Sequence, residues 1–138
     1  MSVILVVDDD PQIRTMMQKI LTKAGHTVVE AASGLEAERR VGESDVDLLI
    51  TDIIMPDKEG LTLVRELHKR WPHLKIIAMS GGGRSGAFTI LDAASQFGAN
   101  LVLRKPFRVV ELLEAVTKVI EMQAGDPAIV RPAAGPTT

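Results

Sequence analysis

Short apolar runs alternate with amphipathic stretches along this chain. Five runs rich in branched apolar residues predict buried strands, over residues 3–7, 27–29, 46–51, 75–79 and 101–103. Between and after them, apolar residues recur at helical spacing and predict helices over residues 11–24, 34–41, 61–70, 85–97 and 109–120. This alternation predicts right-handed crossovers and a parallel sheet with helices on both faces.

Helix boundaries carry recognisable signals. Asp10 is expected to cap the first helix with Pro11 at its first position, and Ser33 to cap the second. We interpret the Met16-Met17 pair as core. From Gly125 onward the chain is mostly Gly, Pro, Ala and Thr without periodicity, so residues 1–124 are predicted to form one domain and 125–138 a disordered tail or a truncated linker.

Composition narrows the function classes. The 138 residues are 46% apolar and 25% charged, which is ordinary for a globular domain, and no apolar run approaches the roughly 20 residues of a membrane span. Cysteine is absent, which excludes disulfides and thiolate metal sites and, with no signal-peptide pattern, favours a cytoplasmic location. A net charge of −2 with scattered basic residues and 3% aromatics argues against direct nucleic-acid binding.

Four of the predicted strands end at polar residues: Asp8-Asp9, Asp52, Ser80 and Lys105. Because parallel strands end at one edge of their sheet, these groups are expected to converge. Crowded carboxylates repel one another, and a hard cation that accepts oxygen ligands, Mg²⁺, relieves that repulsion. Lysine and serine can bind an anion beside it. The set predicts a phosphoryl-transfer site with Asp52 as nucleophile.

Each of these features also has a simpler interpretation. The acidic run 8–10 could only cap a helix, Lys105 could be a surface charge, and Ser80 could be an ordinary strand-end hydroxyl. The glycines at 81–83 are typical of phosphate loops, but no Gly-Lys-Ser/Thr follows, so a nucleotide site is disfavoured. The order and strand-end spacing of all four motifs favour the functional interpretation.

Over roughly residues 2–123 the chain resembles the receiver domain of two-component response regulators. The motifs that carry the resemblance are Asp8-Asp9, Asp52-x-x-Met55-Pro56-x-x-x-Gly60, Ser80-Gly81 and Lys105-Pro106-Phe107. The resemblance implies an α/β, flavodoxin-like (βα)5 three-layer sandwich whose five-stranded parallel sheet has the order 2-1-3-4-5. It further implies that Asp52 accepts a phosphoryl group from a histidine kinase or histidine phosphotransfer protein, and that the domain catalyses only its own phosphorylation and dephosphorylation.

The resemblance also assigns roles at the metal. Asp9 and Asp52 would ligate Mg²⁺ together with the backbone carbonyl of Ile54, and Asp8 would hold a ligated water. These four residues form the expected metal site.

Phosphoryl recognition and switching fall to other residues. Lys105 would pair with phosphoryl oxygens, across a cis bond to Pro106, and Ser80, next to the small Gly81, would move toward the phosphoryl group. The family's usual aromatic switch position is Val102 here, and tyrosine is absent from the chain. A branched valine has few rotamers, so we expect Val102 to stay nearly static and the loop over 81–84 to rearrange instead.

Three functions are compatible with the sequence. A stand-alone receiver, monomeric or weakly dimeric when phosphorylated, would signal to a downstream protein target. The chain could instead be the receiver part of a longer regulator that is truncated within 125–138. A haloacid-dehalogenase-type phosphatase with Asp8 as nucleophile is disfavoured, because the chain is short, lacks a cap domain and gives Asp52-x-x-Met55-Pro56 no role.

Overall fold

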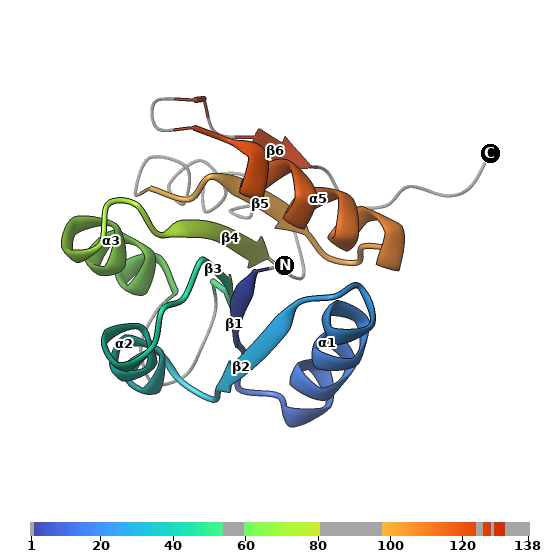
Figure 1. Ribbon diagram of the computed structural model, residues 1–138, viewed down its shortest axis with the longest axis horizontal. Helices are drawn as coiled ribbons and strands as arrows, with labels where there is room; N and C mark the ends of the chain where they lie inside the picture. The colour runs from blue at the N-terminus through green and yellow to red at the C-terminus, as the bar shows by residue number, and fades with distance from the viewer. Residues whose placement is uncertain (1, 54–59, 81–97, 124–125, 128, 132–138) are drawn as a thin grey trace.

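The computed structural model describes residues 2–53, 60–80, 98–123, 126–127 and 129–131 (Figure 1). The strands are β1 Val3–Val7, β2 Thr27–Ala31, β3 Leu48–Asp52, β4 Lys75–Ser80, β5 Leu101–Arg104 and β6 Ile129–Arg131. The helices are α1 Pro11–Lys23, α2 Gly34–Glu43, α3 Gly60–Arg70 and α5 Val109–Glu121. The helix expected over 85–97 lies outside the described residues. No helix in the described part of the chain is both long and apolar enough to span a membrane.

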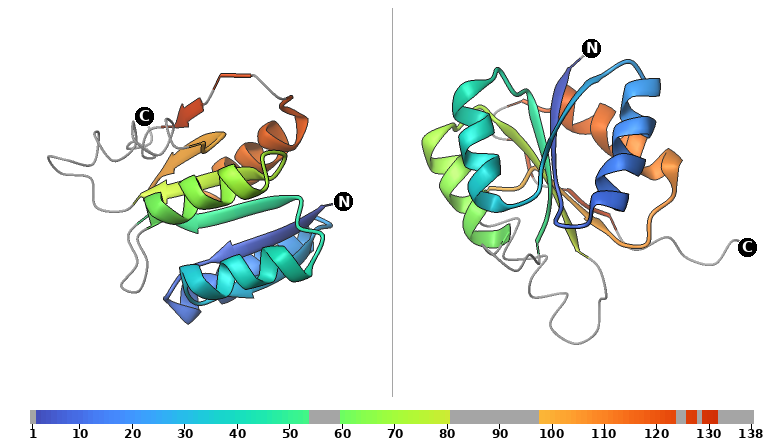
Figure 2. Two further views of the ribbon diagram at one scale, coloured as in Figure 1. Left: turned by 90° about the vertical axis from the view of Figure 1, so that its left-hand side faces the viewer. Right: turned by 90° about the horizontal axis from the view of Figure 1, so that it is seen from below.

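The strands form one parallel sheet in the order β2-β1-β3-β4-β5-β6. Its first five strands have the predicted order 2-1-3-4-5. Helices α2 and α3 cover one face, and α1 and α5 cover the other (Figure 2). The flavodoxin-like three-layer prediction is therefore confirmed.

Alternate residues of the strands face two separate cores, because successive side chains of a strand point to opposite faces. The core under α2 and α3 contains Leu5, Val7, Leu49, Ala78 and Val102. The core under α1 and α5 contains Ile4, Val6, Leu48, Ile50, Ile77, Met79, Leu101 and Leu103. All of these side chains are fully buried, as expected of strands with helices on both faces.

The predicted helix caps are present. The Asp10 carboxylate accepts the Gln12 N–H at 2.9 Å, and the Ser33 hydroxyl accepts the Glu36 N–H at 3.2 Å. The Met16-Met17 prediction is half wrong, since Met17 is fully buried but Met16 is 47% exposed. One helical position rotates a side chain by about 100°, which is enough to move Met16 off the core face.

Strand β6 lies in the segment predicted to be a disordered tail or truncated linker, and for Ile129–Arg131 the structure differs from that prediction. These residues pair in parallel with Leu101–Leu103, and the Ile129 N–H donates to the Asn100 carbonyl at 3.0 Å. Three residues are too few for an alternating apolar and polar pattern to be recognised in the sequence. The strand forms because the edge of β5 offers backbone groups with which it can pair.

Gly98 lies against His68 of α3 and adopts a φ of +121°, which side chains rarely tolerate. A Cβ there would overlap the His68 ring and lie 2.7 Å from its Cβ. Gly98→Ala should therefore lower the free energy of unfolding, measured by urea denaturation, by about 2 kcal/mol. Adding His68→Ala removes the ring but keeps its Cβ, 2.7 Å from the added methyl group, so it should recover only part of that loss.

Gly42→Ala is the matched control, because its added Cβ would meet the Trp71 ring at an ordinary 3.9 Å. It sits in α2 and should be stabilising by about 0.5–1 kcal/mol. If Gly98→Ala is as stable as wild type, the predicted clash with His68 is wrong.

Candidate functional site

Three of the predicted side chains meet at the carboxyl edge of the sheet. Lys105 follows β5 directly, and its Nζ lies 3.0 Å from Oδ2 of Asp52, the last residue of β3. The same Nζ lies 3.7 Å from Oδ2 of Asp8, which follows β1. Side-chain exposure is 22% for Lys105, 14% for Asp52 and 2% for Asp8, so a cation and two carboxylates share a largely enclosed space.

Only one of the two oxygens of the Asp8 carboxylate has a hydrogen-bond partner among the described residues. Its Oδ1 accepts the Asp10 N–H at 2.9 Å, whereas its buried Oδ2 has no hydrogen-bond partner among the described residues. Burial raises the pKa of Asp8 above its ordinary 3.8, the charges of Asp52 and Asp9 act in the same direction, and the Asp10 N–H and Lys105 oppose them. A buried oxygen that has an ion-pair contact but no hydrogen bond, beside a second carboxylate, is a position at which a cation or its bound water fits.

Arg14 of α1 fixes the backbone of Asp8. Its Nη1 donates to the Asp8 carbonyl at 2.7 Å, and its Nε pairs with Glu30 of β2 at 3.2 Å. The Asp8 N–H donates to the Ala31 carbonyl at 3.2 Å, so both sides of this residue are held. The sequence analysis missed Arg14. Its signal was a cation near a helix N-terminus, where the helix dipole disfavours positive charge unless an acceptor compensates.

Asp52 is held by the end of β3. The Thr51 side chain is buried, and its hydroxyl donates to the Asp52 carbonyl at 3.0 Å. Beyond it, the Ile53 N–H donates to the Met79 carbonyl of β4 at 2.8 Å, which extends the ladder past the acid. Asp52 therefore projects from regular strand backbone, the most rigid kind of support for a reactive side chain.

The other predicted site residues are distributed as follows. Asp9 is exposed, Ser80 ends β4 in register with Arg104, and Val102 is fully buried in β5. The Lys105–Pro106 bond is cis, as predicted. Ile54, Gly81 and the loop over 81–84 lie outside the described residues.

The donor set suits magnesium better than a softer metal, because it consists of carboxylates without cysteine or histidine. No group of three acids, histidines or cysteines in the described ranges is gathered closely enough to hold a metal unaided. Magnesium usually keeps several waters and needs only one or two carboxylates, so Asp52 and its acidic neighbours fit it.

An apolar hollow of about 320 Å³ adjoins the site. Ile13 and Met16 of α1 line one side, and Lys105, Pro106 and Phe107 line the other. The half-exposed Met16 side chain thus belongs to a surface that contains the site lysine.

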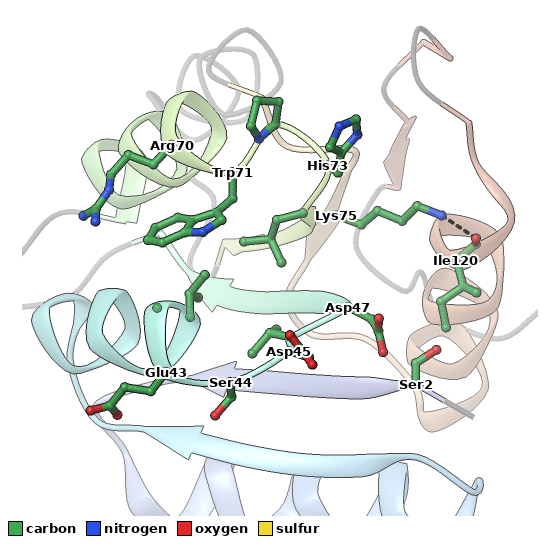
Figure 3. Close-up of a pocket in the computed structure, with 15 residues that line it drawn as sticks. Ser2, Glu43, Ser44, Asp45, Asp47, Arg70, Trp71, His73, Lys75 and Ile120 are labelled. Carbon is green, nitrogen blue, oxygen red and sulfur yellow. Dashed lines mark hydrogen bonds between the residues drawn. The ribbon is translucent and has the colours of Figure 1, made fainter.

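A second hollow of about 810 Å³ lies at the opposite edge, where the strands begin (Figure 3). Three of its polar side chains have structural partners. Lys75 Nζ donates to the Ile120 carbonyl near the end of α5, Asp47 accepts the Val3 N–H at 2.8 Å, and the Arg70 guanidinium lies 4.4 Å from the centre of the Trp71 ring. This hollow shares no residue with the carboxyl-edge site.

Burial of Asp8 predicts a stability effect in metal-free buffer. A carboxyl group whose pKa is raised in the fold contributes most below its unfolded pKa, and that contribution is lost as pH rises through the folded pKa. Asp8→Asn keeps an acceptor for the Asp10 N–H and removes the buried charge. It should raise the free energy of unfolding at pH 7 by about 1 kcal/mol, measured with urea.

The gain should vanish as pH falls below 3.8, the ordinary pKa of Asp8. Asp47→Asn, a matched acid-to-amide change at the opposite edge where the side chain accepts the Val3 N–H, should not be more stable than wild type at pH 7. If Asp8→Asn is less stable than wild type at pH 7, the pairing with Lys105 outweighs burial and this account of Asp8 is wrong.

The chain is similar in sequence and in fold to known proteins. The family model described as "Response regulator receiver domain" matches residues 4–117. The chemotaxis protein CheY of Thermotoga maritima is 36% identical over 117 residues, which cover 84% of this chain and 95% of CheY. The crystal structure of response regulator protein TrrA from Thermotoga maritima, in complex with Mg(2+)-BeF, has 34% identity and a TM-score of 0.76, with 86% of this chain and 99% of that one covered.

Longer relatives match as well. Sensor kinase CckA of Brucella abortus is 37% identical over 122 residues, which are 87% of this chain, and the transcriptional regulator NtrC of Azospirillum brasilense is 37% identical over 126. The chain spans only 13% and 26% of their respective lengths. The family model nevertheless covers most of this chain and contains Asp8, Asp52 and Lys105. The chain therefore belongs to the family of response regulator receiver domains, the signalling domains of two-component systems.

Proposed function

We propose that this receiver accepts a phosphoryl group on Asp52 in a magnesium-dependent reaction and signals through the resulting change of structure. The observation that carries the proposal is the Lys105 ammonium, 3.0 Å from Asp52 and 3.7 Å from the buried Asp8. A nucleophilic carboxylate, a cation for the incoming anion and a partly unpaired second carboxylate are the parts that phosphoryl transfer requires.

In the proposed step, a carboxylate oxygen of Asp52 forms a bond to the phosphorus of a phosphohistidine. The phosphorus–nitrogen bond breaks, its electron pair returns to the imidazole, and that nitrogen takes up a proton. The Lys105 ammonium gives up part of its contact with Asp52 and pairs with a phosphoryl oxygen. Asp8 is the weaker candidate nucleophile, because its side chain is 2% exposed.

Asp9, Asp52 and the Ile54 carbonyl would hold the magnesium ion, with Asp8 bonding a ligated water. When bound, the ion neutralises charge that develops on the phosphoryl oxygens. TrrA, whose structure contains Mg(2+)-BeF, supports this assignment by its similarity. Ser80 and the loop after it would then respond to the phosphoryl group, while the buried Val102 stays in place.

The partner that donates the phosphoryl group would be a histidine kinase or a histidine phosphotransfer protein. It would dock on the apolar hollow formed by Ile13, Met16, Pro106 and Phe107, which adjoins the lysine and exposes apolar surface beside the site. A downstream protein target would read the phosphorylated state. The length of CckA and NtrC favours, as a second candidate, a receiver that works inside a longer protein.

Asp52→Asn should abolish covalent labelling by a small phosphodonor such as acetyl phosphate, because an amide oxygen is a far weaker nucleophile than a carboxylate. Labelling is measured as a gain of roughly 80 Da in intact mass, the addition of HPO3 when one acyl phosphate forms. Asp47→Asn, a matched acid-to-amide change at the opposite edge, should label like wild type. Undiminished labelling of Asp52→Asn would show that another residue is the acceptor.

Asp9→Ala should weaken magnesium binding, measured by calorimetry on the unphosphorylated protein, by at least about 10-fold, since one of two carboxylate ligands is lost. Asp10→Ser is the matched control because serine removes a neighbouring charge but keeps the cap of α1. Equal magnesium affinity in wild type and Asp9→Ala would exclude Asp9 as a ligand.

A further inference from the structure

Among the five predicted strands, β5 is one of the two edge strands, and β2 is the other. Leu101, Val102 and Leu103 have fully buried side chains, and the backbone N–H and C=O groups of β5 that point away from β4 need a partner. An apolar edge of this kind is a template for an added strand. In this chain the partner is β6, in register Leu101↔Ile129, Val102↔Val130 and Leu103↔Arg131 (Figure 1).

Two hydrogen bonds hold Asp126 beside the end of α5. The Gln123 N–H donates to the Asp126 carboxylate at 2.7 Å, and the Asp126 N–H donates back to the Gln123 carbonyl at 3.0 Å. They fix Asp126, three residues before β6 begins, next to Gln123, two residues after the helix ends.

Ile129 anchors the strand. Its N–H donates to the Asn100 carbonyl at 3.0 Å, and its half-buried side chain packs against the core under α1 and α5. β6 thus combines a backbone bond with an apolar anchor, and the bonded pair Gln123 and Asp126 precedes it. Gln123, Asp126 and Ile129 lie beyond residue 117, where the match to the family model ends.

We propose that the β5 edge is a docking edge for a short, extended, parallel peptide segment with a β-branched apolar anchor, and that β6 (Ile129–Arg131) of the same chain occupies it as a displaceable cover. Backbone bonds would supply general affinity and the Ile129 position would supply selectivity, as in other cases of strand addition. The cover is only three residues long, so it can open without unfolding the sheet.

The covalent connection to α5 explains why β6 occupies the β5 edge of its own chain. The short connection from α5 keeps the segment at an effective concentration in the millimolar range, above that of a free competing peptide. This inference does not depend on phosphorylation of Asp52, and its test measures no phosphoryl transfer.

The test uses full-length variants and amide hydrogen exchange. Ile129→Asp removes the anchor, and Asp126→Ala removes the carboxylate that accepts the Gln123 N–H. Both should speed exchange over residues 101–104 at least 10-fold, while β1 and β3 keep wild-type protection. Gln123→Ala is the matched control because it retains the backbone N–H and carbonyl that bond to Asp126, and it should exchange like wild type.

A synthetic peptide with the sequence of residues 123–131 then probes the opened edge. At micromolar concentration it should restore slow exchange of β5 in full-length Ile129→Asp and should not bind wild type. The same peptide carrying aspartate at position 129 should have no effect.

Three results would overturn the proposal. Unchanged β5 exchange in both variants would show that β6 does not cover the edge. Failure of the peptide to protect the opened edge, or equal binding to wild type, would show that the edge is not a docking site covered by this segment. A dimeric mass for wild type that becomes monomeric in Ile129→Asp would show that a second copy, not the same chain, supplies the strand.

Discussion

The ion pair between Lys105 and Asp52 depends on one constraint: β1, β3 and β5 are parallel and end at the same edge of the sheet. The Lys105 Nζ lies 3.0 Å from Asp52 and 3.7 Å from Asp8. Each of the three residues follows or ends a strand whose apolar side chains are buried on both faces. The cores therefore fix the backbone from which the charges project. A slip of one residue in any of these strands would turn its polar end away and also exchange its two faces.

Burial makes the site electrostatically unfavourable by itself. One oxygen of the Asp8 carboxylate accepts a hydrogen bond, the other has none among the described residues, and burial raises the pKa of the group. Arg14 holds the backbone of this residue, because it donates to the Asp8 carbonyl and is itself paired with Glu30. Such an arrangement lowers stability in the absence of a cation, and functional sites commonly retain groups that do so. The same burial strengthens the interaction of these side chains with a bound cation and with an incoming phosphoryl group, because charges interact more strongly away from water.

Much of this fold could be predicted from local patterns, since apolar runs and caps such as Asp10 and Ser33 act over a few residues. The meeting of Asp8, Asp52 and Lys105 followed from a topological rule about parallel strands and did not require their contacts. Strand order came from the family resemblance, because pairing partners are distant in sequence. Arg14, the exposure of Met16 and strand β6 were missed for a shared reason: each is decided by a tertiary neighbour, namely the Asp8 carbonyl, the surface beside Pro106 and the β5 edge.

The central claim is that the reactive carboxylate ends β3 and not β1. Treating the phosphodonor-exposed protein with borodeuteride reduces an acyl phosphate to an alcohol, which marks the acceptor permanently for peptide mass mapping. The account predicts deuterium and the mass loss of an aspartate-to-homoserine conversion in the peptide that contains Asp52, and none in the peptide that contains Asp8 and Asp9. A modification at Asp8 would contradict it and would support the phosphatase-type alternative.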